Sequence, residues 1–320
     1  MVQWPRRVVD SDEIAVRFRV GAWHCINSSV LNRPPMRAWF VSDLHVDICD
    51  WNTRLVDDIV DAMMKDTPDV LVCCGDICVS ELTFRNVLAK FEHIDIPKLF
   101  VPGNHDVWLR KRDVFRCRKG WAGDSWKKLE LLSDICDSVG WKPLMSGPVI
   151  IDDVAFVGTM GWYDYSFRDE HLKVPIESYE AKGTTQQYWN DGIFACFYRN
   201  GKQDTDYKIT EILNGELEKH LIEARGRKII ACTHMIPFKE LQGDMHRDGS
   251  FFNAFGGNAT MGDLLVEHGV SVSVSGHLHR NFHRVVRGID CYQTSVGYLH
   301  TETGYDADAF LSNRTLLLDL

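Results

Sequence analysis

In its first third the chain reads Leu99-Phe100-Val101-Pro102-Gly103-Asn104-His105-Asp106. The three apolar residues are typical of a short buried strand, and the Pro-Gly pair ends that strand in a turn. The turn carries an amide, an imidazole and a carboxylate, all of which can bind a metal ion. Four other apolar runs end in a similar way, and they read Val41-Ser42-Asp43-Leu44-His45, Cys74-Gly75-Asp76, Cys232-Thr233-His234 and Val274-Ser275-Gly276-His277-Leu278-His279.

Apolar residues at helical spacing separate several of these strands. We expect strands within 38–41, 70–74, 99–101, 149–157, 228–232, 270–274 and 282–294, and helices within 55–64, 81–92, 124–139 and 208–224. Alternation of strands and helices predicts an α/β arrangement in which functional residues lie at the ends of the strands.

The residues at these strand ends favour a particular class of metal. Carboxylate, amide and imidazole groups together suit Mn, Fe or Zn better than Ca. Seven side chains are candidate ligands, namely Asp43, His45, Asp76, Asn104, His234, His277 and His279. In the D-x-H and H-x-H segments, i, i+2 spacing on an extended chain is expected to direct both side chains to the same side. Seven ligands are too many for one tetrahedral ion, so we expect two ions that share a carboxylate.

Two neighbouring ions indicate chemistry on phosphate. Ions about 3.5–4 Å apart clamp a phosphoryl group and lower the pKa of a bound water to about 7. No serine or cysteine stands out as a nucleophile, so we expect direct attack by a hydroxide bound to the metals.

The motifs D-x-H, G-D, G-N-H-D, H and G-H-x-H occur in this order between about residues 37 and 300, and together they resemble those of the calcineurin-like metallophosphoesterase superfamily. The resemblance implies a mixed α/β (α+β) fold, in which a two-layered β-sandwich is flanked by helices, here with a large central insertion. It also implies two divalent transition-metal ions at the rim of the sandwich. The second motif lacks the arginine of the phosphoprotein phosphatases, and the third ends in Asp106 rather than glutamate, so that branch is disfavoured.

The resemblance also implies a role for each motif residue. One ion would be held by Asp43, His45 and His279, the other by Asn104, His234 and His277, with Asp76 bridging the two. His105 would be the general acid or a donor to the transition state, and Asp106 would orient and charge its ring. The remaining histidines are expected to be ordinary polar residues, with His300 a candidate for the rim of the site.

Residues 108–225 differ from the rest because they contain six of the ten tryptophans. We predict an N-terminal extension over 1–36, with one possible edge strand at 17–20, and a phosphoesterase domain over 37–320. Within this domain, a cap-like insertion is expected over about 108–225.

Four residues are candidates for contact with the substrate. Residues 108–128 carry a local charge of +6, which is either a basic lip or a solvated surface, and Arg110 within it and Arg280 could reach phosphoryl oxygens. Trp162 and Tyr163 either stack on a flat group of the substrate or belong to the core of the cap.

Composition narrows the function further. With 45 acidic and 36 basic residues, the chain has a formal charge of −9, which argues against a broad nucleic-acid binder. No apolar run approaches the roughly 18 residues of a membrane span, no secretory leader is visible and the cysteines have no framework spacing, so we expect a cytoplasmic protein. We therefore expect hydrolysis of a small-molecule or nucleotide phosphate ester. The alternatives are a nuclease acting on DNA or RNA ends and, less favoured, an inactive interaction scaffold.

Overall fold

The computed structural model describes residues 34–48, 50–120, 123–242, 250–298 and 307–320. Residues Met36–Leu320 form one compact unit, which carries every element discussed below. The possible edge strand at 17–20 and His300 lie outside the described residues.

The first sheet has five strands in the order β13-β1-β2-β3-β4. These are β1 (Arg37–Val41), β2 (Val70–Cys73), β3 (Lys98–Phe100), β4 (Lys142–Pro143) and β13 (Leu316–Asp319). Strands β1 to β4 run parallel, whereas β13 pairs antiparallel with β1. Every residue of β2 and β3 is buried, as expected of parallel strands covered on both faces.

The second sheet has six strands in the order β11-β12-β10-β9-β6-β5. These are β5 (Val149–Ile151), β6 (Val154–Thr159), β9 (Lys228–Thr233), β10 (Val272–Ser275), β11 (Phe282–Val286) and β12 (Ile289–Gln293). The four inner strands are parallel, and a hairpin closes each edge. Each apolar run named in the sequence analysis therefore forms a strand.

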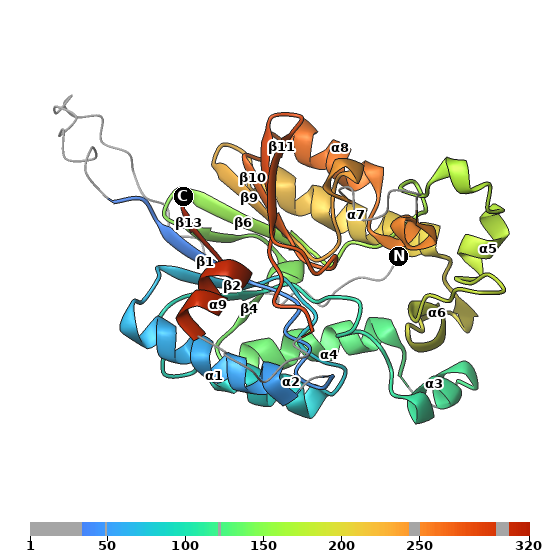
Figure 1. Cartoon of the computed structure of the whole chain (residues 1–320), viewed down its shortest axis with the longest axis horizontal. Coiled ribbons are helices and arrows are strands. Elements are labelled where there is room, and N and C mark those ends of the chain that lie inside the picture. The colour runs from blue at the N-terminus through green and yellow to red at the C-terminus, as the bar shows by residue number, and fades with distance from the viewer. Residues whose placement is uncertain (1–33, 49, 121–122, 243–249, 299–306) are drawn as a thin grey trace, which may run out of the picture. The chain divides into compact units, whose positions relative to one another are not determined.

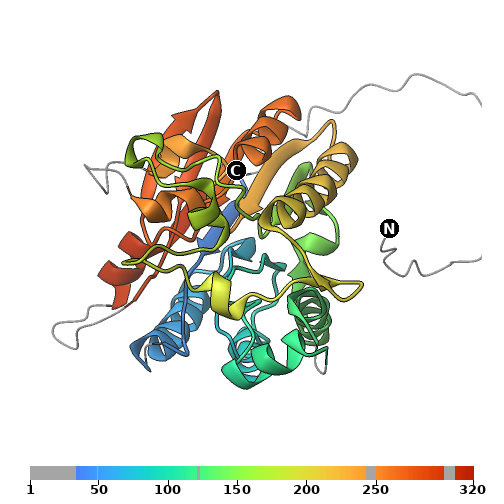
Figure 2. The ribbon, with the colours of Figure 1, turned by 90° about the vertical axis from the view of Figure 1, so that its right-hand side faces the viewer.

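The two sheets pack face to face. Phe40 and Val72 of the first sheet share one buried cluster with Phe156, Ile230 and Val274 of the second. Helices α1 (Asp50–Lys65), α2 (Glu81–Ala89), α4 (Ser125–Ser138) and α9 (Ala307–Arg314) cover the outer face of the first sheet, and α7 (Asp206–Glu223) and α8 (Ala259–Glu267) cover that of the second. Figures 1 and 2 show these helices on opposite sides of the paired sheets. This arrangement confirms the predicted sandwich flanked by helices.

Only part of the range 108–225 lies outside these layers. From that range α4, β4, β5, β6 and α7 all belong to the sheets or to their covering helices. Helix α3 (Lys111–Arg118) and residues 160–205 lie outside the layers. We call residues 160–205 the cap segment. The cap segment contains α5 (Ile176–Glu180), α6 (Asp191–Phe194), β7 (Tyr198–Arg199) and β8 (Lys202–Gln203), and it lies at the end of the sheets that faces the viewer in Figure 2.

Aromatic side chains form the core of the cap segment. Trp162, Tyr163, Tyr165, Tyr179 and Phe197 are buried in one cluster, which also includes residues from neighbouring parts of the chain. The high tryptophan content of this region is therefore used mainly for packing.

Two sequence expectations concern thiols and membranes. The eight cysteines within the described residues are free thiols, and all of them are buried. Among the described helices, none combines the length and apolar character needed to cross a membrane.

Candidate metal centre

The loops that follow five of the parallel strands meet at one edge of the sandwich. We call them the strand-end loops, and they comprise residues 42–45, 75–78, 102–106, 234 and 276–279. Backbone hydrogen bonds join them, for example from the His45 amide to the Asp76 carbonyl at 2.9 Å. Side chains join loops of different sheets, since the His277 amide donates to Asp43 Oδ1 at 3.0 Å. The candidate ligands of both sheets therefore lie in one cluster.

Two glycines allow the loops after β2 and β3 to approach closely. A Cβ atom at Gly103 would lie 2.1 Å from Asp76 Oδ1, and one at Gly75 would lie 2.5 Å from the Gly103 nitrogen. Gly75 also has a φ of +94°, which side chains disfavour. Glycine is thus required at both positions for the Asp76 carboxylate to lie against the Gly103 backbone.

Most candidate ligands have a left-handed backbone conformation. Five of the eleven non-glycine residues with positive φ in the described chain are predicted ligands, namely Asp43, His45, Asp76, His277 and His279, with φ between +42° and +70°. The D-x-H and H-x-H segments are therefore not extended, which differs from the extended conformation expected from their i, i+2 spacing. Their paired side chains still reach one site, but through two left-handed residues each. This conformation costs roughly 1–2 kcal/mol per residue and is typical of functional sites.

The first group of side chains that could hold an ion consists of Asp43, His45 and His279. The Nε2 atoms of His45 and His279 are 3.0 Å apart, and His279 Nε2 is 3.6 Å from Asp43 Oδ1. His45 Nε2 is also 3.6 Å from Asp76 Oδ2. Four donor atoms thus surround one small volume.

The second group consists of Asp76, His234 and His277. His234 Nε2 is 3.4 Å from Asp76 Oδ2 and 3.1 Å from Asn104 Oδ1. His234 Nδ1 lies 2.8 Å from the Cys74 carbonyl oxygen, to which it can donate, so that Nε2 remains available as a ligand. The same Asp76 oxygen faces His45 and His234, as expected of a carboxylate shared by two ions.

These distances fit two divalent ions. Ligands about 2.1 Å from an ion are separated by roughly 3.0–3.4 Å, close to the separations in both groups. Burial lowers the pKa of His45 and of His277 to about 3, so both rings are neutral, as metal ligands must be. Burial alone would raise the pKa of Asp76, but the imidazoles of His234 and His105 hold it well below its usual range. The charged carboxylate is thus favoured where two ions would share it.

His105 lies beside the first group but is held differently from the prediction. Its ring is 4.7 Å from that of His45, and it stacks on Trp108 with centroids 3.7 Å apart. Its backbone amide donates to Asp76 Oδ1 at 2.9 Å.

Asp106 does not orient the His105 ring, in contrast to the expectation from the resemblance. Its carboxylate is fully buried and accepts four backbone N–H bonds of 2.8–3.0 Å, from Asp76, Ile77, Cys78 and Gly103. All four donors belong to the strand-end loops after β2 and β3. Asp106 therefore fixes the conformation of these two loops rather than the histidine.

Sequence reasoning missed Asp191 of the cap segment. This fully buried carboxylate accepts hydrogen bonds from Asn104 Nδ2 (2.9 Å), Trp108 Nε1 (2.6 Å), Tyr163 Oη (3.1 Å) and Trp189 Nε1 (2.7 Å). The surrounding sequence, Trp189-Asn190-Asp191-Gly192, contains no motif that would single it out.

Tyr298 is a second residue that the predicted site did not include. Its ring is 4.5 Å from that of His279 and 4.8 Å from that of His45. It is the last described residue before residues 299–306, which include His300. Its exposed fraction of 38% places it at the surface of the cluster.

The four candidate substrate residues are used within the protein. Trp162 and Tyr163 are buried, so neither offers an open face for stacking, and their polar atoms bind Asp206 and Asp191. Arg110 is half exposed and pairs with Asp113 at 3.1 Å. The Arg280 guanidinium donates to the Gln242 carbonyl and lies over the Phe282 ring.

The predicted basic lip also loses one member. Lys128 is buried, and its ammonium donates to the carbonyl oxygens of Val79 and Trp108 at 2.6 and 2.5 Å. It therefore supports the loop that carries Trp108 instead of facing a substrate.

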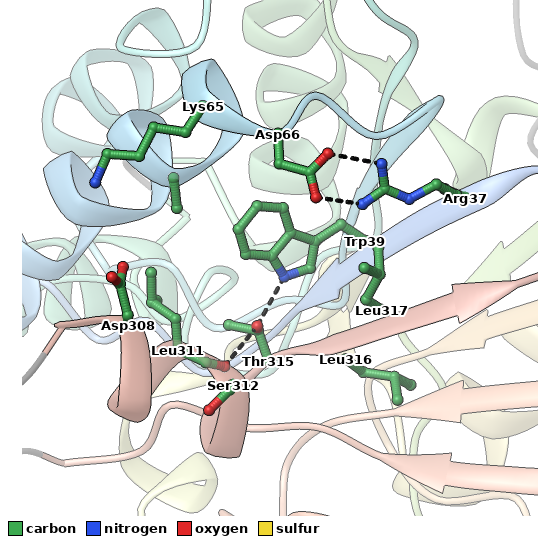
Figure 3. Close-up of a pocket in the computed structure, with 11 residues that line it drawn as sticks. Arg37, Trp39, Lys65, Asp66, Asp308, Leu311, Ser312, Thr315, Leu316 and Leu317 are labelled. Carbon is green, nitrogen blue, oxygen red and sulfur yellow. Dashed lines mark hydrogen bonds and ion pairs between the residues drawn. The ribbon is translucent and has the colours of Figure 1, made fainter.

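A separate cavity of about 540 Å³ lies toward the other end of β1, between α1, α9 and β13 (Figure 3). The Trp39 indole donates to Thr315 Oγ1 at 2.7 Å, and Arg37 forms two hydrogen bonds with Asp66. None of the predicted site residues lines this cavity. It is thus distinct from the candidate metal centre.

Comparison with known proteins bears on the family and the fold of the chain. The family model for calcineurin-like phosphoesterases matches residues 36–281. An uncharacterized protein of Acanthamoeba polyphaga mimivirus is 22% identical over 296 residues, which cover 88% of this chain and 98% of that protein. The crystal structure of a phosphopantetheinyl hydrolase from Mycobacterium tuberculosis matches with a TM-score of 0.66 and 19% identity, covering 83% of this chain and 90% of that one. The structural match shows the same fold.

Proposed function

Because the chain belongs to the calcineurin-like phosphoesterase family, we propose that it is a dinuclear-metal hydrolase of a small-molecule or nucleotide phosphate ester. The observation that carries this proposal is the shared carboxylate. One oxygen of Asp76 lies 3.6 Å from His45 Nε2 and 3.4 Å from His234 Nε2, so that a donor group stands on either side of it.

We assign the candidate ligands accordingly. One ion would be held by Asp43, His45 and His279, the other by Asn104, His234 and His277, with Asp76 between them. The ions, of the Mn, Fe or Zn type, would polarise the phosphoryl group and activate the attacking water.

His105 is the proposed proton donor to the leaving oxygen of the ester. Support for this role comes from its position, because its ring contacts that of His45 and is partly exposed at the surface of the cluster. Stacking on Trp108 limits rotation of the ring. Histidine is the side chain most often used for proton transfer in catalysis.

The proposed substrate class follows from the charge of the chain. The formal charge of −9 disfavours a long nucleic acid, which leaves a small ester or a nucleotide as the favoured substrate. A nuclease acting on DNA or RNA ends is the second candidate, supported by the exposed basic residues of α3.

The proposal is tested by metal analysis and by a substrate panel. We expect about two transition-metal ions per purified chain, and turnover of phosphomonoesters, phosphodiesters or nucleotides with added manganese. The panel should include a phosphopantetheine diester, because a hydrolase named for that group shares the fold. Retention of activity on oligonucleotide ends, with binding that falls steeply with salt, would favour the nuclease.

Three variants complete the test. Asp76→Ala should lose both ions and turnover, whereas His105→Ala should keep the ions and lose about 10²–10⁴-fold in kcat. His283→Ala is the matched control, because this half-exposed histidine of β11 pairs with Asp290 of β12 and the variant should behave as the unaltered protein does. Full activity of both Asp76→Ala and His105→Ala would refute the proposed function.

A further inference from the structure

Asp191 connects the cap segment to three parts of the candidate metal centre. Each carboxylate oxygen accepts two hydrogen bonds, and all four donors are side chains. We propose that Asp191 is a positioning residue, which fixes the amide of Asn104 as a ligand and the stacked pair of Trp108 and His105 as the proton donor. This inference rests on the proposed function and states how a proposed ligand and the proposed proton donor are held in position.

The first connection concerns which end of the Asn104 amide faces the metals. Asn104 Nδ2 donates to Asp191 Oδ1 at 2.9 Å, so Oδ1 of the amide faces His234 Nε2 at 3.1 Å. An amide group has nearly the same shape after rotation by 180°, and its hydrogen bonds decide its orientation. Because the Trp108 indole can only donate, the Asp191 oxygen that it shares with Asn104 is an acceptor. Asp191 therefore selects the amide orientation that offers an oxygen ligand.

The second connection reaches His105. The same oxygen of Asp191 accepts from Trp108 Nε1 at 2.6 Å, and the Trp108 ring stacks on His105 with an interplanar angle of 24°. The hydrogen bond fixes the plane of the indole, and the indole in turn limits the orientation of the imidazole. One carboxylate oxygen therefore orients a proposed ligand and the proposed proton donor together.

The other carboxylate oxygen anchors the cap segment itself. Asp191 Oδ2 accepts from Trp189 Nε1 at 2.7 Å and from the Tyr163 hydroxyl at 3.1 Å. The Trp189 ring contacts His277 edge to face, with centroids 5.9 Å apart. The cap segment is thus tied to ligands that follow strands of both sheets.

A second buried carboxylate, that of Asp206, is closely matched to Asp191. Asp206 is also buried in the cap region, at the start of α7, and its donors are Trp162 Nε1, the Tyr165 hydroxyl and the Lys182 ammonium. Within the described residues, the hydrogen bonds of these three donors to Asp206 reach no candidate ligand. A substitution of Asp206 therefore serves as the control, because it disturbs a similar buried carboxylate without disturbing the proposed positioning.

The substitution Asp191→Asn tests the inference because it places an NH₂ group where an oxygen accepts two donors. The indole N–H groups of Trp108 and Trp189 cannot accept a hydrogen bond, whereas the Asn104 amide can do so by rotating its oxygen away from the metals. The Tyr163 hydroxyl can also accept, so Asp191→Asn is made in a Tyr163→Phe background, in which only the Asn104 amide can. We expect this variant to fold, and to bind one of two manganese ions 10–100-fold more weakly than Tyr163→Phe alone.

The experiment titrates the chelator-treated full chain with manganese and follows each variant's fold by circular dichroism. Asp206→Asn should bind both ions as the unaltered protein does. Trp108→Phe keeps an aromatic ring against His105 but lacks the donor to Asp191, so it should lower kcat at least tenfold with metal affinity and KM unchanged.

Several results would overturn the inference. Manganese affinity of folded Asp191→Asn equal to that of Tyr163→Phe alone would do so, as would equal weakening by Asp206→Asn. If Asp191→Asn does not fold, an unchanged kcat of Trp108→Phe overturns it and the expected loss supports it. An unaltered protein that binds no manganese, iron or zinc would instead refute the proposed function, and the positioning role with it.

Discussion

The strand-end loops and the cap segment both contain buried carboxylates, but different donors hold them. Asp106 accepts only backbone N–H groups, four in total, from the loops after β2 and β3. Within the described residues, Asp191 of the cap segment and Asp206, which directly follows that segment, accept only from side chains. Backbone donors are present whatever residues occupy those positions, whereas each side-chain donor depends on one residue elsewhere in the chain.

This difference teaches how each region is specified. The loops need one aspartate and two glycines within short motifs, Gly75-Asp76 and Gly103-Asn104-His105-Asp106. The cap segment needs indole, phenol and ammonium groups from separate segments to meet at a carboxylate. The loops are therefore locally encoded, and the cap segment is encoded by distant residues acting together.

The largest change in the free energy of unfolding is expected for a substitution of Asp106. Asp106→Asn leaves two of four buried N–H groups facing an NH₂ group, at a cost of about 4 kcal/mol in the free energy of unfolding. Urea denaturation followed by circular dichroism measures the change. A loss below about 0.5 kcal/mol would mean that the backbone bonds do not hold the loops, and it would remove the contrast with the cap segment.

A smaller change in the free energy of unfolding is expected for a substitution of Lys182, which tests the side-chain donors of the cap segment. Its ammonium lies 2.6 Å from Asp206 Oδ2 with 13% of the side chain exposed, and Lys182→Met should cost about 2 kcal/mol. Manganese binding per folded chain should stay unchanged, because no donor of Asp206 binds a candidate ligand. A loss of one manganese ion in this variant would show that the cap segment acts on the centre as a whole.

The smallest effect concerns the left-handed backbone of the strand-end loops. In the metal-free protein, His279→Gly should be about 0.5–1 kcal/mol more stable than His279→Ala, because glycine adopts a φ of +52° without steric cost. At His283, in the extended strand β11, the order of the two variants should be reversed. Thermal unfolding of the four variants, each with a chelator, decides between these signs.

Most of the strand-end loops could be predicted from the sequence. Short apolar runs marked the strands, and the polar residues after them proved to lie together. Their local conformation could not be predicted, since the D-x-H and H-x-H segments are left-handed rather than extended. The acceptor role of Asp106 was also missed, because backbone N–H groups carry no signal in a sequence.

Two features at long range could not be predicted at all. Strands β13 and β1 are paired although they lie at opposite ends of the domain in the sequence. The register of β13 therefore depends on the packed sandwich. Asp191 gathers donors from positions 104, 108, 163 and 189, and only the folded cap segment brings them within hydrogen-bond distance. Neither residue spacing nor periodicity records such contacts.

The position of the candidate ligands between two sheets also sets the order of events during synthesis. Asp43 and His279 belong to one group of ligands but are 236 residues apart in the chain. At roughly 5–20 residues per second, the ribosome needs about 12–47 s to extend the chain from the first to the second. The nascent chain therefore cannot bring this candidate group together until the strands up to β10, which come from both sheets, have been translated. Any metal that binds to this group would do so late in biosynthesis.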